Sequence, residues 1–509
     1  MAAHTIMIQG TSSSVGKSLL VTALCRIFRQ DGWRVAPFKS QNMSNNSYIT
    51  QDGLEIGRAQ GVQAEAAGVP ATADMNPVLL KPSTDSASQV VIHGRPRGDM
   101  DFRVYQEEGH EAAASAIRES LERLRKAYEI LVIEGAGSPA EVNLNDRELV
   151  NMRIAAWADA PVLLAADIDQ GGALAALVGT LELLNPEDRD RVAGLIINKF
   201  RGDLGLLEPA LEFLEKRTGK PVVGVVPYLP IDLEAEDAHS LYMQGAGSPE
   251  EDAQLTICAV HLPYISNFTD LDPLRRAPGV RVVWVQHPAQ LQGADAVVIP
   301  GTKNTAADLR WLWQTGLGAA IQRLAERGVP VVGICGGYQM LGARVLDPHG
   351  YESSYPETPG LGLLDAETEF GPAAEKLTVL AEAELLPVPG PLQAQTGAVI
   401  RGYEIHAGHT RLGAGARPLV RHLERGEVLG AADDAGQVWG CYLHDLFQNE
   451  GLRRAWLTWL WQRRGLVPPA SGGGDDAGRD AVYDQLAGAV RAALDMERIY
   501  RIMGLEPRR

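Results

Sequence analysis

The sequence predicts an α/β protein made of two doubly wound α/β domains in tandem, followed by a helical tail. Three observations support this prediction. An apolar run at residues 5–8 passes through a glycine-rich loop into a helix-like segment at 19–28. Short apolar runs then alternate with helix-length segments along both halves of the chain, as they do in parallel sheets with crossover helices. An acidic, loop-like stretch at 229–253 separates the two series.

The apolar runs have the composition of buried parallel strands. In the first series they are 5–8, 33–38, 130–134, 162–167, 194–199 and 222–226, and in the second they are 254–260, 280–285, 296–300 and 329–334. The predicted helices are 19–28, 56–67, 111–128 and, in the tail, 480–496. We therefore expect domains at 1–240 and 254–465, a linker at 241–253, and a glycine-rich tether with a C-terminal helix at 466–509.

The composition of the chain indicates which kinds of partner it can bind and in which cellular compartment we expect it. At 509 residues the chain is too long for one ordinary core. The net charge of −17 argues against nucleic-acid and membrane-surface partners, which are themselves anionic. No apolar run approaches the roughly 18 residues of a membrane span, and no secretory leader precedes the first run. The four cysteines are scattered without a C-x-x-C pair, so we expect a cytoplasmic protein.

The loop at 10–18, which reads GTSSSVGKS, predicts an ATP site. Backbone N–H groups of such a loop turn toward a polyphosphate, and the next helix points its positive end at the same place. We expect Lys17 to reach the β- and γ-phosphates and Ser18 to hold Mg²⁺. A Gly/Ser-rich turn that happens to precede a lysine is the alternative. The predicted ATP contacts are Gly10, Thr11, Ser14, Val15, Gly16, Lys17 and Ser18.

Polar residues at the ends of other strands extend this predicted site. Asn198 and Lys199 end one strand and could contact the adenine or could simply terminate a surface strand. Lys39 opens the run KSQNMSNNS after the second strand, where it could neutralise a phosphate or carboxylate or belong to a solvated loop. Because hard cations prefer oxygen ligands, we expect Glu134, at the end of a buried strand, and Asp52 to join Ser18 around Mg²⁺. Asp52 could instead only start a helix.

A cysteine elbow marks the second domain. Cys335 follows a buried strand and precedes two glycines and a helix-like segment, a pattern that presents the thiol outward at a helix N-terminus. A buried structural cysteine is the alternative. His444 is the predicted base because it follows a strand far along the chain, with His406 as its rival. The N–H groups of Gly336 and Gly301 could form an oxyanion hole.

Together these motifs resemble the cobyric acid synthase family, over nearly the whole chain from Gly10 to about Phe447. The glycine loop, with five residues between Gly10 and the Gly-Lys pair, resembles that of dethiobiotin synthetase, and the elbow resembles a flavodoxin-like glutamine amidotransferase. The run KSQNMSNNS separates the chain from the sister enzyme that makes the a,c-diamide. Most such amidotransferases carry His-x-Glu, in which the acid orients the imidazole. Here Leu446 stands two residues after His444, and cobyric acid synthases share this absence of the acid. The group that orients His444 is therefore unassigned.

The resemblance implies an enzyme that uses ATP, Mg²⁺ and glutamine. It implies amidation of the b, d, e and g carboxylates of adenosylcobyrinic acid a,c-diamide to adenosylcobyric acid, through an acyl phosphate and ammonia released from glutamine. Lys17 and Lys39 would offset charge during phosphoryl transfer, while Cys335 and His444 would release ammonia. The protein could form a homo-oligomer. The alternatives are an amidotransferase for another acid, either in a,c-diamide formation or on a cell-wall precursor, and a partition-type ATPase.

Overall fold

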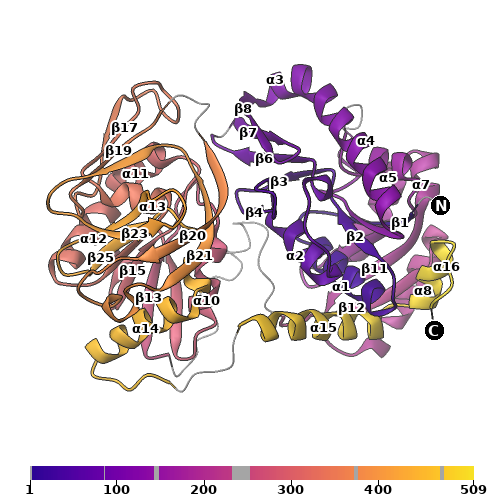
Figure 1. The fold of residues 1–509 in the computed structure, drawn as a ribbon. Coiled ribbons are helices and arrows are strands. Elements are labelled where there is room, and N and C mark those ends of the chain that lie inside the picture. The colour runs from indigo at the N-terminus through magenta and orange to yellow at the C-terminus, as the bar shows by residue number, and fades with distance from the viewer. Residues whose placement is uncertain are drawn as a thin grey trace.

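Two lobes lie side by side, and the C-terminal tail returns to the first of them (Figure 1). The computed structural model describes residues 3–84, 86–142, 148–231, 253–371, 376–469 and 475–508. The predicted linker at 241–253 lies outside these residues except for Ala253, and part of the predicted tether, 470–474, lies outside them too.

The first lobe is organised around a six-stranded parallel sheet in the order β12-β11-β10-β1-β9-β2. Its strands are β1 (His4–Gly10), β2 (Val35–Phe38), β9 (Ile130–Glu134), β10 (Val162–Asp167), β11 (Val192–Phe200) and β12 (Val222–Pro227). The helices of this lobe include α1 (Lys17–Gln30), α2 (Arg58–Ala67), α4 (His110–Ala127), α5 (Met152–Ala158), α6 (Ala173–Leu183), α7 (Pro186–Arg191) and α8 (Glu208–Thr218). The strand order reverses direction at β1, so ligands are expected at the carboxyl end of this strand.

The segment between β2 and α4 forms two small sheets that the sequence patterns did not predict. One has the order β3-β6-β7-β8, and the other is the hairpin β4-β5. Their strands are β3 (Gln41–Met43), β4 (Ser47–Ile49), β5 (Glu55–Gly57), β6 (Val78–Pro82), β7 (Ala87–Ile92) and β8 (Arg95–Asp101). These strands lie where the first lobe meets the second (Figure 1). Residues Glu55–Gly57 pair as a strand, so the predicted helix at 56–67 begins at Arg58.

The second lobe holds a nine-stranded mixed sheet in the order β14-β13-β15-β16-β25-β24-β23-β20-β21. The first five run parallel, and the remaining pairings are antiparallel. Its strands are β13 (Leu255–Val260), β14 (Val280–Val285), β15 (Ala296–Ile299), β16 (Val331–Ile334), β20 (Leu377–Leu385), β21 (Val399–His406), β23 (Arg417–His422), β24 (Val428–Ala432) and β25 (Val438–Cys441). The doubly wound pattern is therefore confirmed for the parallel half and extended by an antiparallel half.

The remaining elements of the second lobe cover and cap this sheet. A four-stranded sheet has the order β18-β17-β19-β22, from β17 (Arg344–Leu346), β18 (Glu357–Pro359), β19 (Ala366–Glu369) and β22 (His409–Leu412). The helices include α10 (Asp272–Arg275), α11 (Thr305–Gln314), α12 (Leu317–Glu326), α13 (Gly336–Leu341) and α14 (Glu450–Arg463). Among the described residues, no helix is both long and apolar enough to cross a membrane.

The tail docks on the first lobe. Helix α15 (Asp475–Ala493) packs against α1, and α16 (Met496–Ile502) follows it (Figure 1). Leu486 and Val490 are fully buried there, while Arg26 of α1 pairs with Asp484 at 2.7 Å. The tail therefore fastens the end of the chain to the phosphate-loop helix.

Candidate active sites

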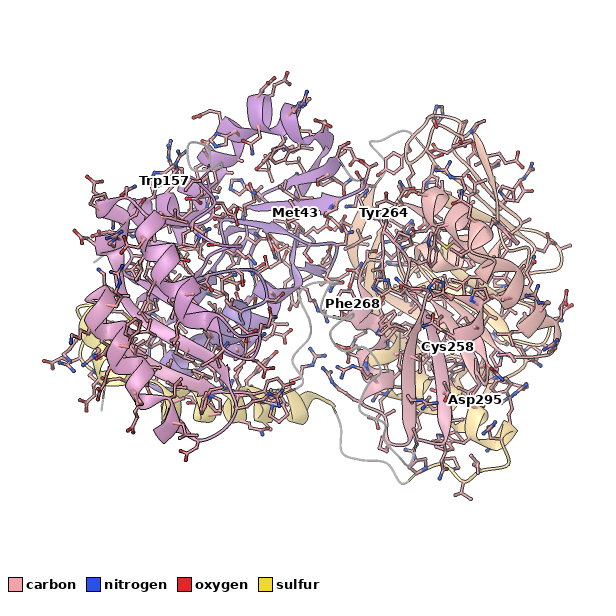
Figure 2. The ribbon with its side chains drawn as sticks, turned by 180° about the vertical axis from the view of Figure 1, so that it is seen from behind. Met43, Trp157, Cys258, Tyr264, Phe268 and Asp295 are labelled. Carbon is pink, nitrogen blue, oxygen red and sulfur yellow. The ribbon has the colours of Figure 1, made fainter. Side chains whose placement is uncertain are left out.

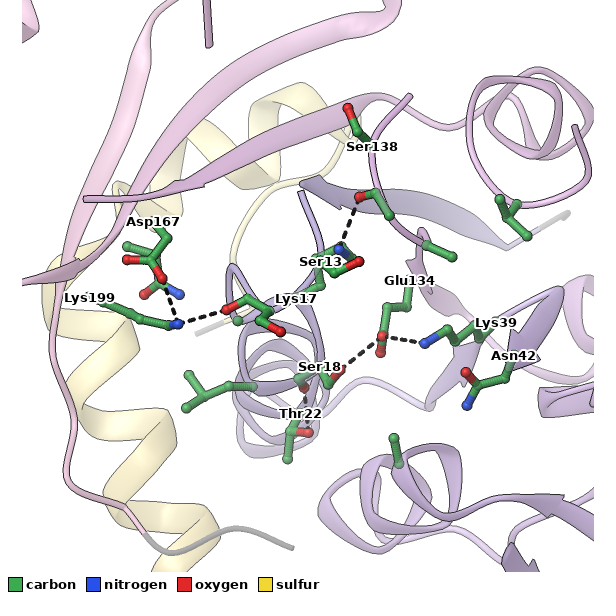
Figure 3. Close-up of a pocket in the computed structure, with 18 of the residues that line it drawn as sticks. Ser13, Lys17, Ser18, Thr22, Lys39, Asn42, Glu134, Ser138, Asp167 and Lys199 are labelled. Carbon is green, nitrogen blue, oxygen red and sulfur yellow. Dashed lines mark hydrogen bonds and ion pairs between the residues drawn. The ribbon is translucent and has the colours of Figure 1, made fainter. Parts of the chain in front are cut away.

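A cavity of about 1020 Å³ opens at the carboxyl end of β1, beside the glycine loop (Figure 3). Gly16, Lys17 and Ser18 line it, together with Lys39, Glu134, Asn198 and Lys199. This volume lies at the upper end of the range for small-molecule sites. The structure thus brings together predicted residues from four separate strand ends.

Glu134 is the centre of a polar cluster in this cavity. Its Oε1 accepts hydrogen bonds from Ser18 Oγ and Lys39 Nζ, each at 2.9 Å (Figure 3). Its Oε2 accepts one from Gln63 Nε2 at 2.5 Å. The carboxyl group is almost fully buried, and these three donors satisfy its oxygen atoms. A hydroxyl and a carboxylate side by side are hard oxygen donors that suit Mg²⁺.

The glycine loop packs against Asn198 too closely to accept a side chain at Gly16. Gly16 has φ +96°, and a Cβ there would collide with the Asn198 amide. Asn198 Nδ2 donates to the Val15 carbonyl at 2.7 Å, and Lys199 Nζ donates to the Ser14 carbonyl at 2.6 Å. Asn198 and Lys199, at the end of β11, therefore hold the backbone of the glycine loop in place. The sequence did not indicate these contacts.

Lys17 and Lys199 bring positive charge to the loop. Lys17 Nζ donates to the Ser12 carbonyl at 2.9 Å and to the Gly137 carbonyl at 3.1 Å. Lys199 Nζ also pairs with Asp167 at 2.7 Å, a cavity-lining acid that was not among the predicted site residues (Figure 3). Asp167 ends β10 just as Glu134 ends β9, so the same strand-end signal could have identified it.

Asp52 does not belong to this site. It lies exposed in the turn between β4 and β5, where Thr50 Oγ1 donates to it at 2.5 Å, and it does not line the cavity. The prediction failed because the segment after β2 folds into a hairpin that carries Asp52 toward the second lobe, where Gly53 lies near the backbone of Thr378.

Cys335 adopts the strained geometry of an elbow between β16 and α13. Its φ is +49° and its ψ is −109°, a conformation rare for a residue with a Cβ. A Cβ on Gly337 would collide with the Ile299 backbone, so the tight turn requires glycine there. Cys335 is 5% exposed and lines a small cavity between the lobes. The thiol therefore faces a cavity rather than the core alone.

His444 is the imidazole partner of this thiol. The Cys335 side chain is near enough to raise the pKa of the His444 imidazole, whose Nδ1 lies 2.7 Å from Oδ2 of Asp270. Burial lowers the pKa of His444, but the negative charges of Asp270 and Cys335 outweigh it and raise the pKa to about 10. Asp270 therefore occupies the position of an orienting acid, which the sequence left unassigned. It follows β13, so its position after a parallel strand was the available signal.

His406 occupies a different position. Its Nε2 lies 3.2 Å from Glu404 and its ring stacks on Tyr442, with centroids 3.7 Å apart. It lines the cavity near Cys335, and its ring is held by Glu404, the Gly408 carbonyl and Tyr442. The predicted base, His444, is the histidine that combines a carboxylate and the thiol.

The two glycines of the predicted oxyanion hole flank the same cavity. A Cβ on Gly301 would lie 2.9 Å from Cε1 of His444, and one on Gly336 would collide with Thr302. Gly336 and Thr302 line the cavity. The loop after β15 therefore lies against the elbow after β16, and both border the Cys335 cavity.

The first lobe contacts the residues next to His444. Ser47 N–H donates to Oδ1 of Asn267 at 2.8 Å, and Nδ2 of Asn267 lies 3.3 Å from Nε2 of His444. Asn46 Oδ1 accepts from the N–H of Phe268 at 3.2 Å. Figure 2 shows Met43, from the same run, on the first-lobe side of the junction and Tyr264 and Phe268 on the second-lobe side. The run KSQNMSNNS therefore spans from Glu134 in one site to the neighbours of His444 in the other.

Comparison with known proteins agrees with this pair of sites. The model of the CobQ/CobB/MinD/ParA nucleotide binding domain matches residues 6–241. The model of the CobB/CobQ-like glutamine amidotransferase domain matches residues 256–452.

Curated relatives match over almost their whole length. The cobyric acid synthase of Pelotomaculum thermopropionicum is 53% identical, with 99% of this chain and 97% of the relative covered. That of Desulforamulus reducens is 51% identical, with 99% and 98% covered. That of Sorangium cellulosum is 50% identical, with all of both chains covered. The chain belongs to the cobyric acid synthase family.

Proposed function

We propose that this protein is an ATP- and glutamine-dependent ligase of cobalamin biosynthesis. It amidates the b, d, e and g carboxylates of adenosylcobyrinic acid a,c-diamide to give adenosylcobyric acid. The observation that carries this proposal is the pairing, in one chain of this family, of a Cys335–His444–Asp270 cluster with a phosphate-loop cavity.

The first site activates the carboxylate. A substrate carboxylate oxygen attacks the γ-phosphorus of ATP, ADP leaves, and an acyl phosphate forms. Lys17 and Lys39 offset the negative charge of this transfer. Ser18 and Glu134 would hold Mg²⁺, which when bound neutralises charge on the phosphate oxygens. Ammonia then attacks the acyl carbon and phosphate leaves with the C–O bond electrons, so the amide forms.

The second site releases the ammonia. The Cys335 thiolate attacks the amide carbon of glutamine, and the N–H groups of Gly301 and Gly336 stabilise the resulting oxyanion. His444 gives a proton to the amide nitrogen as the C–N bond breaks. A water molecule, deprotonated by His444, then cleaves the thioester and releases glutamate.

The rival functions have less support. A partition-type ATPase has no use for the buried thiol, imidazole and carboxylate of the second lobe. Another acid substrate, such as cobyrinic acid or a cell-wall precursor, would use the same two sites, so the substrate assignment depends on the family match over the full chain.

Mass spectrometry of product mixtures tests the proposal. We expect corrinoid a,c-diamide, glutamine and MgATP to yield a species with four amidations. We expect Cys335→Ala to lose this activity with glutamine but to retain it with ammonium chloride. No mass change with any corrinoid would reject the substrate, whereas loss of the ammonium reaction in Cys335→Ala would reject the division of labour between the sites.

A further inference from the structure

The cavity beside Cys335 is closed by charged residues from both lobes. Lys81 of β6 comes from the first lobe, while Lys303, Glu352 and Lys376 come from the second. Such a concentration of charge is costly to bury unless each group has a counter-charge. The pairing of these groups therefore indicates what the cavity is built to receive.

Two of the three lysines share one carboxylate. Glu55 is fully buried and accepts from Lys81 Nζ at 2.5 Å and from Lys376 Nζ at 2.9 Å. Lys81 also donates to Ser47 Oγ at 2.8 Å, and Lys376 donates to Gln89 Oε1 at 2.7 Å. The hydrogen bonds of these two ammonium groups are thus directed toward the first lobe.

Lys303 stands apart from this arrangement. Among the residues that the structure describes, none accepts a hydrogen bond from its ammonium group or forms an ion pair with it. The side chain is surrounded by protein, keeps some accessible surface, and lines the cavity. Burial lowers its pKa, and the charges of Asp99 and Glu352 oppose this shift only in part, because among the described residues no counter-charge touches the ammonium group. An incoming carboxylate would supply that counter-charge.

Glu352 supplies the opposite charge in the same cavity. Its carboxylate accepts from the N–H of Thr305 at 2.6 Å, at the start of α11. Its own loop is fixed by Asp347, whose carboxylate accepts from the N–H groups of Tyr351 and Glu352 at 2.7 and 2.8 Å. Burial raises the pKa of Glu352 to about 7, so an ammonium group nearby would favour its charged form.

We propose that Lys303 binds the α-carboxylate of glutamine and Glu352 binds its α-ammonium group while the side-chain amide faces Cys335. Cationic and anionic groups within one small cavity match the zwitterion that distinguishes an amino acid from a simple amide. The inference rests on the proposed glutaminase role of Cys335.

Alkylation of Cys335 by two reagents tests this inference in the full chain. 6-Diazo-5-oxo-norleucine carries the α-amino acid group of glutamine, and the thiolate displaces N₂ from its protonated diazo carbon to leave a thioether. Iodoacetamide carries no such group. The rates of both reactions would be followed by mass spectrometry of the Cys335 peptide in Lys303→Met, Glu352→Gln and the exposed control Lys126→Met, a lysine on the surface of α4.

We expect Lys303→Met and Glu352→Gln each to slow the reaction of Cys335 with 6-diazo-5-oxo-norleucine, the diazoketone, by about 10- to 100-fold, which corresponds to the loss of one charged hydrogen bond. The rate of reaction with iodoacetamide should stay within about twofold of the wild-type rate. The KM for glutamine would rise by a similar factor, while the ammonium-dependent amidation stays unchanged. Lys303→Arg would retain much of the diazoketone rate. Lys126→Met would behave as wild type with both reagents.

Two results overturn different claims. If both reagents slow equally, or if the diazoketone rate does not change, Lys303 and Glu352 do not recognise the amino acid group. If wild-type Cys335 reacts with iodoacetamide but never with the diazoketone, the proposed glutaminase site itself is wrong.

Discussion

Oδ2 of Asp270 lies 2.7 Å from Nδ1 of His444, although 174 residues separate them in the chain. Both side chains are buried, and the second carboxylate oxygen of Asp270 accepts from the N–H of Asp445 at 2.7 Å. The contact fixes the ring so that Nε2 faces the thiol side of the site. A carboxylate at this position favours the proton on Nδ1, and in the proposed mechanism Nε2 then exchanges protons with substrate.

Removing the Asp270 charge should disable ammonia release. We expect Asp270→Asn to reduce the glutamine-dependent rate by about 10²- to 10⁴-fold, because an amide cannot stabilise the imidazolium. Amidation from ammonium should persist, since the first site is untouched. Steady-state kinetics with each nitrogen source measure this, and Asp434→Asn on the exposed surface is the matched control. An equal loss with both nitrogen sources would contradict the assignment.

The same contact predicts the alkaline limit of glutamine hydrolysis. Because the pKa of His444 is raised to about 10, its proton and the ion pair that it supports are present below that pH and are lost as the pH rises through it. We expect the glutaminase rate to fall near pH 10 in the wild type. In Asp270→Asn, burial would dominate and the fall would begin at lower pH. A pH–rate profile of both proteins checks the direction.

Glu134 rather than Asp52 should matter for nucleotide use. We expect Glu134→Gln to reduce ATP-dependent amidation by about 100-fold or more, because the substitution removes a buried charge next to Ser18 and Lys39. Asp52→Asn should leave the rate and the Mg²⁺ requirement unchanged, since Asp52 is exposed in a hairpin turn. ADP release measured against Mg²⁺ concentration distinguishes them, and the reverse ranking would restore Asp52 as a ligand.

The contact between the lobes should affect the rate of glutamine hydrolysis at the His444 site. Asn46→Ala removes the acceptor of the Phe268 N–H, and we expect the glutaminase kcat to fall by about 3- to 10-fold, equivalent to one hydrogen bond. Its neighbour Asn45 donates within its own lobe, to the Pro82 carbonyl at 3.3 Å, so Asn45→Ala is the control. Equal effects of the two substitutions would show that the contact does not act on His444.

The tail helix should stabilise the first lobe. Leu486 of α15 is fully buried against that lobe, so we expect Leu486→Ala to lower the free energy of unfolding by about 2–5 kcal/mol. Leu206, at 84% exposure, is the control, and Leu206→Ala should change it little. Calorimetric unfolding of the full chain measures both. A tail that is not docked in solution would make the two variants indistinguishable.

Local sequence patterns were sufficient to predict the site residues that directly follow a single buried strand. The glycine loop after β1, Glu134 after β9 and Cys335 after β16 each follow a buried strand, and the parallel sheet places such ends at one edge. The predicted helix at 480–496 is present as α15, displaced toward the tether. The hairpin of β4 and β5 was missed because three-residue strands carry too little pattern to distinguish them from a helix start.

The amino-acid sequence alone determined that this chain carries a phosphate loop and a cysteine elbow, because each motif is made by consecutive residues whose backbone geometry depends on nearby glycines. Only the tertiary structure decided which acid orients His444, that Asp52 lies elsewhere, and that Lys81, Glu55 and Lys376 meet between the lobes. Those relationships join residues tens to hundreds of positions apart, and their energies come from burial and charge pairing that exist only once the two lobes are packed together.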